Sequence, residues 1–163
     1  MSSEPVTDDL EAAPVAGLLR RLAALLYDGF LIAAIWMALG FAMQFVVGPD
    51  TNHLVDGQVQ TDPVIGAILF VGEVVTAAGF YVWFWTRTGQ TLGMLAWRIQ
   101  VVSSDGSLIS FKQALLRWAI AWPSFFCFGV GYLWHYIDKH GNAIHDILSG
   151  TQVIVVAKGG RNF

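Results

Sequence analysis

The sequence contains a single cysteine, Cys127, and this scarcity excludes two kinds of structure. One cysteine cannot form an intrachain disulfide, and it cannot build a cysteine-based metal site. Cys127 lies in an apolar stretch with no recognisable base nearby, so it is typical of a small hydrophobic residue rather than of a nucleophile.

Charge is also scarce, because Asp, Glu, Lys and Arg make up 13% of the 163 residues while 55% are hydrophobic. Soluble domains carry about 25% charged residues. The low charge excludes a disordered chain or a coiled coil, and nine Lys and Arg against 12 Asp and Glu exclude nucleic acid as a partner. A chain this short cannot bury so much apolar surface in a soluble fold. The composition therefore predicts an all-α membrane protein that is embedded in the lipid bilayer.

The N-terminus has neither the positive start nor the short apolar run of a secretory signal peptide. Residues Met1 to Gly17 are polar and acidic, and we predict a disordered tail there. The apolar run that follows is too long for a signal peptide, so it is expected to stay as an anchor.

Two long apolar runs predict two transmembrane helices. Leu22–Val47 has 26 residues with one charge, Asp28, and Pro63–Trp85 has 23 residues with one charge, Glu73. At 1.5 Å per residue, both exceed the roughly 30 Å hydrocarbon core of a bilayer. The segment between them, Gly48–Asp62, is acidic and is interpreted as a loop.

The basic residues predict the orientation of these helices. Arg20 and Arg21 precede the first helix, Arg87 follows the second, and the connecting loop has no Lys or Arg. Cytoplasmic loops are enriched in Lys and Arg. Both ends of this helical hairpin, including the N-terminus, are therefore expected in the cytoplasm.

The segment from 118 to 134 allows two interpretations. Its 17 residues reach only the lower limit for a spanning helix, and Pro123, Gly129 and Gly131 interrupt it. A re-entrant helical hairpin keeps all nine basic residues on the cytoplasmic side, whereas a third span places the C-terminal ones outside. Two β-branched runs, Ile99–Val102 and Thr151–Val156, are predicted to pair as a small cytoplasmic β element, which favours the hairpin.

Two intramembrane acids are candidates for an ion or proton site. Asp28 lies about 9 Å into the first helix, and Glu73 lies about 15 Å into the second, close to the bilayer midplane. A carboxylate at such a depth costs roughly 2.5–3.5 kcal/mol on insertion scales, so each needs a partner or a function. For Asp28 we predict an ion pair with Arg117, with Arg21 nearby, while headgroup contact remains an alternative. For Glu73 the alternatives are a neutral buried acid, ion or proton coupling, and an oligomer contact.

Sequence motifs for binding a cofactor are missing or weak, and we predict no cofactor. Gly89 and Gly93 have neither the dinucleotide-binding nor the Walker spacing. The only metal-like group has no standard zinc spacing and is interpreted as solvated or capping; it consists of His135, Asp138, His140, His145 and Asp146. Without a nucleophile–base pair as well, an enzyme is the weakest functional class.

Several phrases together resemble the RDD family of bacterial membrane proteins, which is named for one arginine and two aspartates. They are Arg21-Leu-Ala-Ala-Leu-Leu-Tyr-Asp28, Gly89-Gln-Thr-Leu-Gly93, Val101-Val-Ser-Ser-Asp-Gly106, Ala114-Leu-Leu-Arg117, and His145-Asp146 with Gly150-Thr151. The resemblance covers roughly 18–156, leaving 157–163 as a tail, and it implies Arg21, Asp28 and Asp146 as signature residues. The sequence departs at Met94, where the family commonly has Lys. The resemblance implies the bacterial inner membrane, but no agreed activity.

Two functions remain open at this point. The acids within the membrane favour a small ion or solute transporter or a transporter subunit, which must be oligomeric because two or three helices cannot enclose a pathway. The small size and the small residues of the second helix favour a scaffold or accessory subunit bound to other membrane proteins.

Overall fold

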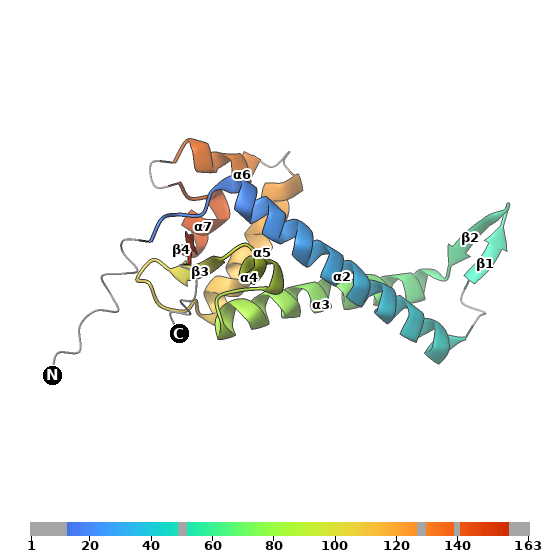
Figure 1. Ribbon diagram of the computed structural model, residues 1–163. Helices are drawn as coiled ribbons and strands as arrows, with labels where there is room; N and C mark the ends of the chain where they lie inside the picture. The colour runs from blue at the N-terminus through green and yellow to red at the C-terminus, as the bar shows by residue number, and fades with distance from the viewer. Residues whose placement is uncertain (1–12, 49–51, 127–129, 139–140, 157–163) are drawn as a thin grey trace. The chain divides into compact units, whose positions relative to one another are not determined.

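The computed structural model describes residues 13–48, 52–126, 130–138 and 141–156, except the side chains at 59, 125, 126, 130, 132 and 135. The described chain is mostly helical, with a few short strands (Figure 1). It divides into two compact units, one formed by Met1–Asp28 with Phe80–Phe163 and the other by Gly29–Gly79. Cys127, His140 and the predicted C-terminal tail lie outside the described residues.

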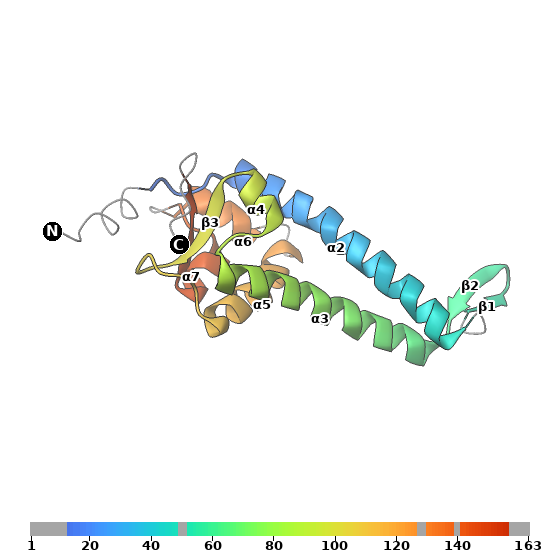
Figure 2. The ribbon, with the colours of Figure 1, turned by 60° about the horizontal axis from the view of Figure 1, so that its bottom comes forward.

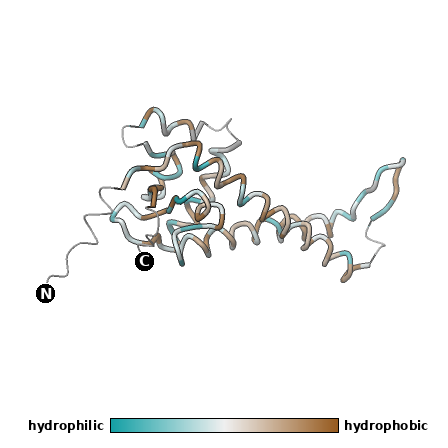
Figure 3. Tube along the Cα trace, in the orientation of Figure 1, coloured by the Kyte–Doolittle hydropathy of each residue, from teal (hydrophilic) through white to brown (hydrophobic). Residues whose placement is uncertain are grey.

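Two helices are long and apolar enough to cross a membrane, as the sequence predicts. Helix α2 spans Leu18–Val47 and helix α3 spans Pro63–Arg87. Their most apolar stretches are almost entirely unburied by the protein itself, and hydrophobic residues follow one another along both (Figure 3). Helix α2 begins four residues before the predicted Leu22, so Arg20 and Arg21 are helical, and α3 continues two residues beyond Trp85.

Within the unit Gly29–Gly79, the two helices touch through a few specific contacts. The Trp36 indole Nε1 donates a hydrogen bond of 3.0 Å to the backbone carbonyl of Glu73. Gly72 lies against Leu39, where an added Cβ would come within 3.2 Å of the leucine side chain. A small residue thus lets the helices approach closely, which is typical of packing inside a bilayer.

The segment predicted as a loop between these helices contains a β-hairpin. Strand β1 (Asn52–Val55) pairs antiparallel with β2 (Gln58–Thr61). Asp56 and Gly57 join them with φ of 51° and 76°. Positive φ at both central residues gives the primed turn that suits the twist of a hairpin, and Asp-Gly is a preferred sequence for it. The prediction of a plain loop is wrong, because the Asp-Gly turn brings the two flanking segments into an antiparallel pair.

The other unit contains the predicted β element. Strand β3 (Ile99–Ser103) pairs antiparallel with β4 (Thr151–Val155), with Val101 opposite Val153, and Figure 2 shows them side by side. The opposite edge of β4 is also occupied, because Ala16 donates to the Val153 carbonyl and Val155 donates to the Pro14 carbonyl. The predicted disordered tail is therefore too long at its end, since Pro14 to Ala16 are held on the sheet.

Short helices pack around this sheet. They are α4 (Leu92–Ala96), α5 (Phe111–Phe126), α6 (Val130–Leu133), the 3-10 turn η2 (Trp134–Tyr136) and α7 (Ile144–Ser149). The core of the unit is made by Ile99, Val101 and Val153 of the strands together with Trp85, Met94 and Ala114. The Ser110 hydroxyl accepts from the Gln113 backbone amide at 3.3 Å and so caps the N-terminus of α5.

The segment 118–134, for which a re-entrant hairpin and a third span are both open, is divided between α5, α6 and the first residue of η2. Residues 127–129 lie outside the described residues. Helix α6 lies back against α5, because an added Cβ at Gly131 would overlap the Ser124 side chain. Helix α5 has 16 residues, about 24 Å at 1.5 Å per residue, which is shorter than a bilayer core.

Candidate functional site

Asp146 forms the centre of a buried polar cluster at the N-terminus of α7. Its side chain accepts a hydrogen bond from the Ala143 backbone amide at 3.0 Å, so it caps the helix that carries it. The side chain is fully buried. A carboxylate at the first turn of a helix is favoured by the unpaired amides there, and this local preference fixes the position of Asp146.

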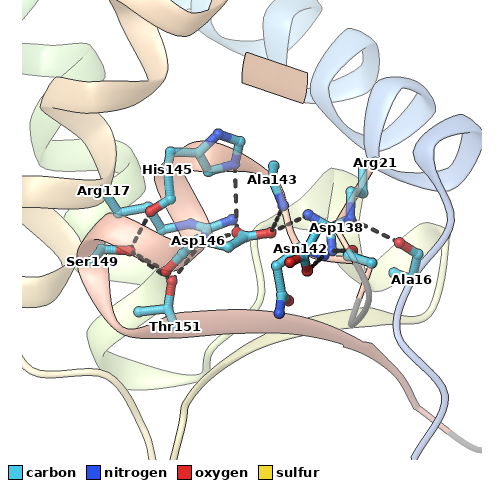
Figure 4. Close-up of polar contacts among 11 residues, drawn as sticks. Ala16, Arg21, Arg117, Asp138, Asn142, Ala143, His145, Asp146, Ser149 and Thr151 are labelled. Carbon is cyan, nitrogen blue, oxygen red and sulfur yellow. Dashed lines mark hydrogen bonds and ion pairs between the residues drawn. The ribbon is translucent and has the colours of Figure 1, made fainter. Parts of the chain in front are cut away.

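Two arginines from different helices converge on this carboxylate (Figure 4). Arg21 of α2 pairs with one carboxylate oxygen and Arg117 of α5 pairs with the other. Arg21 also donates from Nε to the Ala16 carbonyl at 2.8 Å, and Arg117 donates to the Thr151 hydroxyl at 2.7 Å. The cluster therefore ties α2, α5, α7 and β4 together.

The electrostatics of the cluster keep Asp146 charged and its neighbour His145 neutral. Burial alone would raise the pKa of Asp146, but the charges of Arg117 and Arg21 outweigh it and hold that pKa well below its usual range. Burial, and then the charge of Arg117, lower the pKa of His145 to about 3. Two arginines against one aspartate leave a formal excess of one positive charge in this buried cluster.

Asp28 contacts different residues from the predicted partner, Arg117. It is 2% exposed, and its carboxylate accepts hydrogen bonds from the Thr91 hydroxyl at 2.5 Å and from the Gly93 amide at 2.8 Å. An added Cβ at Gly93 would overlap the Ala24 carbonyl and the Asp28 carboxylate. The predicted ion pair of Asp28 with Arg117 is wrong, because Arg117 pairs with Asp146 instead.

Glu73 is half-buried at the contact between α2 and α3. Its backbone carbonyl accepts from Trp36 and from the Thr76 hydroxyl. Among the described residues, its carboxylate makes no hydrogen bond or ion pair, which distinguishes it from Asp28 and Asp146.

The metal-like group of the sequence, which is expected to be solvated or capping, is separated in the described part of the chain, and His145 and Asp146 are buried rather than solvated. No group of three or more described His, Cys, Asp or Glu side chains could hold a metal ion. His145 and Asp146 belong to the arginine cluster, while Asp138 accepts from the Asn142 amide at 2.8 Å. His140 and the side chain of His135 lie outside the described parts.

Sequence reasoning missed Thr91, Gly93 and Thr151 as partners of the signature charges. Thr91 and Gly93 stand in the Gly89-Gln-Thr-Leu-Gly93 phrase, where Thr91 is also the N-cap of α4 and accepts from the Met94 amide at 3.2 Å. A threonine directly before a short apolar patch is a helix-start signal. Met94, which follows Gly93 directly, is buried in the core.

Comparison of the sequence with known protein families finds a match to one family. The sequence profile of the RDD family matches residues 15–150, which is most of the chain. No curated protein and no solved structure gives a significant match. The matched range includes α2, α3 and the three charged residues Arg21, Arg117 and Asp146, and the chain therefore belongs to the RDD family.

Proposed function

We propose that the protein is a multi-pass protein of the bacterial inner membrane, with its N-terminus in the cytoplasm. The two apolar helices and the family support a membrane protein. The finer topology is supported by the basic residues, because Arg20, Arg87, Arg98 and Lys112 are all exposed on the unit that contains the sheet. The hairpin β1–β2 and its flanks carry no Lys or Arg, which is typical of an external loop.

The strand pairing supports a re-entrant path for 118–134 rather than a third span. Strands β3 and β4 share one ladder, so they lie on the same side of the membrane. The chain between them must then cross the bilayer an even number of times or not at all. The return of α6 along α5 and the short length of α5 fit a helical hairpin that enters and leaves from one side.

For activity, we propose a small oligomeric transporter of an ion or solute, or a subunit of one, in which Glu73 is the ion or proton site. The observation that carries this proposal is the Glu73 carboxylate. It lies ten residues from one end of α3 and fourteen from the other, about 15 Å and 21 Å along the helix. Asp28, the other candidate, is held by Thr91 and Gly93 and is assigned a structural role.

The proposal requires several copies of the chain, because two helices cannot surround a pathway. The most apolar stretches of α2 and α3 are almost entirely uncovered by the chain itself, and lipid or neighbouring copies must cover them. Ion flux into liposomes containing the purified protein tests the proposal. Glu73→Gln should abolish flux while protein abundance stays unchanged. Asp62→Asn is a matched control, since it removes a negative charge at the start of the same helix, where an asparagine can still cap it.

A non-enzymatic scaffold or accessory subunit is the second candidate function. The observation that favours it is the arginine–aspartate cluster, which is buried and occupied by contacts within the chain. Such a cluster stabilises a fold and presents no open site for chemistry. Equal flux from wild type, Glu73→Gln and protein-free liposomes, with stable co-purification of a larger membrane complex, would favour the scaffold over transport.

A further inference from the structure

Helix α4 presents an apolar face that the chain itself leaves uncovered. Gly93 and Met94 point inward and are buried, whereas Leu92, Leu95 and Trp97 are 42%, 47% and 45% exposed. A soluble helix of this size would turn polar side chains outward. In α4 and the residue that follows it, the outward positions carry the large apolar side chains.

This face cannot turn inward, because α4 is held in place on α2. The Asp28 carboxylate binds the Thr91 hydroxyl and the Gly93 amide, and the Gly93 Cα lies too close to the Ala24 carbonyl to leave room for a side chain. The contacts fix α4 at the level of Ala24 to Asp28 along α2. The packing of α4 on α2 therefore fixes its apolar face in an exposed orientation.

The level of α4 is also set by the end of α3. Only four residues separate Arg87, the last residue of α3, from Leu92. The last turns of α3 carry the exposed Trp83, and the Arg87 guanidinium lies 4.7 Å from the centre of its ring. Aromatic and basic residues gather in this way where a helix leaves the hydrocarbon for the headgroups. This pattern puts the start of α4 at the membrane–water boundary expected for α3.

Positive charge accompanies the apolar face. Arg98 directly follows Trp97 and has an exposed side chain. Its backbone is fixed, because its amide donates to the Leu95 carbonyl at 3.2 Å and its carbonyl accepts from the Val156 amide at 2.9 Å. Interfacial helices combine an apolar face with basic side chains in this way, and the charge attracts anionic lipid headgroups.

We propose that α4, Trp97 and Arg98 form an interfacial membrane-binding element. Leu92, Leu95 and Trp97 lie among the lipid chains just below the headgroups, and Arg98 binds the phosphate of an anionic lipid. The bilayer is the occupant because this face adjoins the ends of the two apolar helices within the same unit and carries complementary charge. The element is independent of any transport through Glu73.

Depth measurements test the apolar part of the proposal. A nitroxide label is attached at Leu95→Cys in a Cys127→Ala background, and the protein is reconstituted into phosphatidylcholine–phosphatidylglycerol liposomes. The label should collide more with oxygen, which concentrates in lipid, than with a water-soluble nickel chelate. A label at Asp105→Cys, in the exposed turn after β3, is the matched control and should show the reverse.

Two results would overturn the placement in lipid. A Leu95 label that collides with the nickel chelate as readily as the Asp105 label would put α4 in water. A label shielded from both reagents and broadened by a second nitroxide would show that another copy of the chain covers the face.

The phosphate contact is tested by the lipid dependence of thermal stability. Adding phosphatidylglycerol to phosphatidylcholine nanodiscs should raise the melting temperature of the wild type. Arg98→Gln should lose part of this shift, and Arg98→Lys, which keeps the charge, should retain most of it. Equal shifts in all three proteins would overturn the contact.

Discussion

At the scale of single residues, the cluster around Asp146 combines one carboxylate with two guanidinium groups in a buried site. Burying a charge is costly unless it is paired and hydrogen-bonded. Asp146 meets this condition through both arginines and the Ala143 amide. Among the described residues it is the one carboxylate that contacts both arginines, so its loss leaves two buried positive charges without their counterion.

Asp146→Asn should therefore destabilise the protein more than either Arg21→Gln or Arg117→Gln. Removing one partner of a buried pair costs about 3–5 kcal/mol. Thermal unfolding in detergent or nanodiscs measures the loss. Asp105→Asn, a substitution of the same kind in an exposed turn, should have little effect. Equal melting temperatures for Asp146→Asn and Asp105→Asn would contradict a stabilising role of the cluster.

The neutral state of His145 predicts a pH dependence of stability. Burial and the charge of Arg117 lower the pKa of this imidazole in the folded protein to about 3, from its ordinary value of 6.5. The unfolded chain therefore binds a proton first as pH falls, and stability decreases from pH 6.5 towards pH 3. The expected loss is about 1.4 kcal/mol for each pH unit below about pH 6.

Urea unfolding at three pH values between neutral and mildly acidic, in a fixed detergent, measures this slope. His145→Gln should reduce it, because glutamine does not titrate. His53→Gln, in the exposed strand β1, should keep the wild-type slope. A His145→Gln protein with an unchanged slope would show that the pH dependence arises elsewhere.

At the scale of elements, α4 is joined to α2 by contacts that allow no extra atom. Gly93→Ala places a methyl group against the Ala24 carbonyl and the Asp28 carboxylate, which breaks the bond from the Gly93 amide. Overpacking of this kind costs about 1–3 kcal/mol. Gly29→Ala is the matched control, because nothing lies within 4 Å of the added Cβ and alanine favours the helix.

We expect Gly93→Ala to lower the melting temperature and Gly29→Ala to preserve or raise it. Proteolysis of the folded protein gives a second readout, since a loosened α4 should make the segment near Arg98 easier to cut by trypsin. Equal melting temperatures and equal cutting of the two variants would show that the packing of Gly93 is not important.

At the scale of the whole molecule, segments far apart in sequence meet in the unit that contains the sheet formed by β3 and β4. Residues Pro14 to Ala16 bond to β4, β4 pairs with β3, and Arg21 pairs with Asp146. Each contact requires both partners to be on the same side. These contacts support the proposal that the start of α2 and the chain after α3 share one compartment, and the basic residues favour the cytoplasm for it.

Cysteine labelling in intact cells tests this topology. In a Cys127→Ala background, His53→Cys should react with an impermeant reagent from outside, while Asp105→Cys and Lys158→Cys should react only after the cells are opened. Reaction of the Lys158 site from outside would restore a third span through 118–134. Reaction of the Asp105 site from outside would invert the orientation.

The sequence by itself determined the two helices long enough to cross a membrane and the pairing of the small sheet. Apolar runs longer than a bilayer core, Asp28 and Glu73 within them, and the asymmetry of basic residues are properties of composition and order, so they can be recognised without a fold. The pairing of β3 with β4 followed from two β-branched runs that each left an unpaired edge. The family followed from phrases in a fixed order.

Only the tertiary structure decided which charges meet. Arg117 is equally available to Asp28 and Asp146 on sequence grounds, because charge and depth do not specify direction around a helix. In the structure, Arg117 pairs with Asp146, which also caps α7. Asp28 instead accepts hydrogen bonds from the Thr91 hydroxyl and the Gly93 amide at the start of α4. That choice depends on how α2, α4, α5 and α7 pack, and the reason is steric: Gly93 allows α4 to approach α2 closely enough for the Asp28 contacts to form.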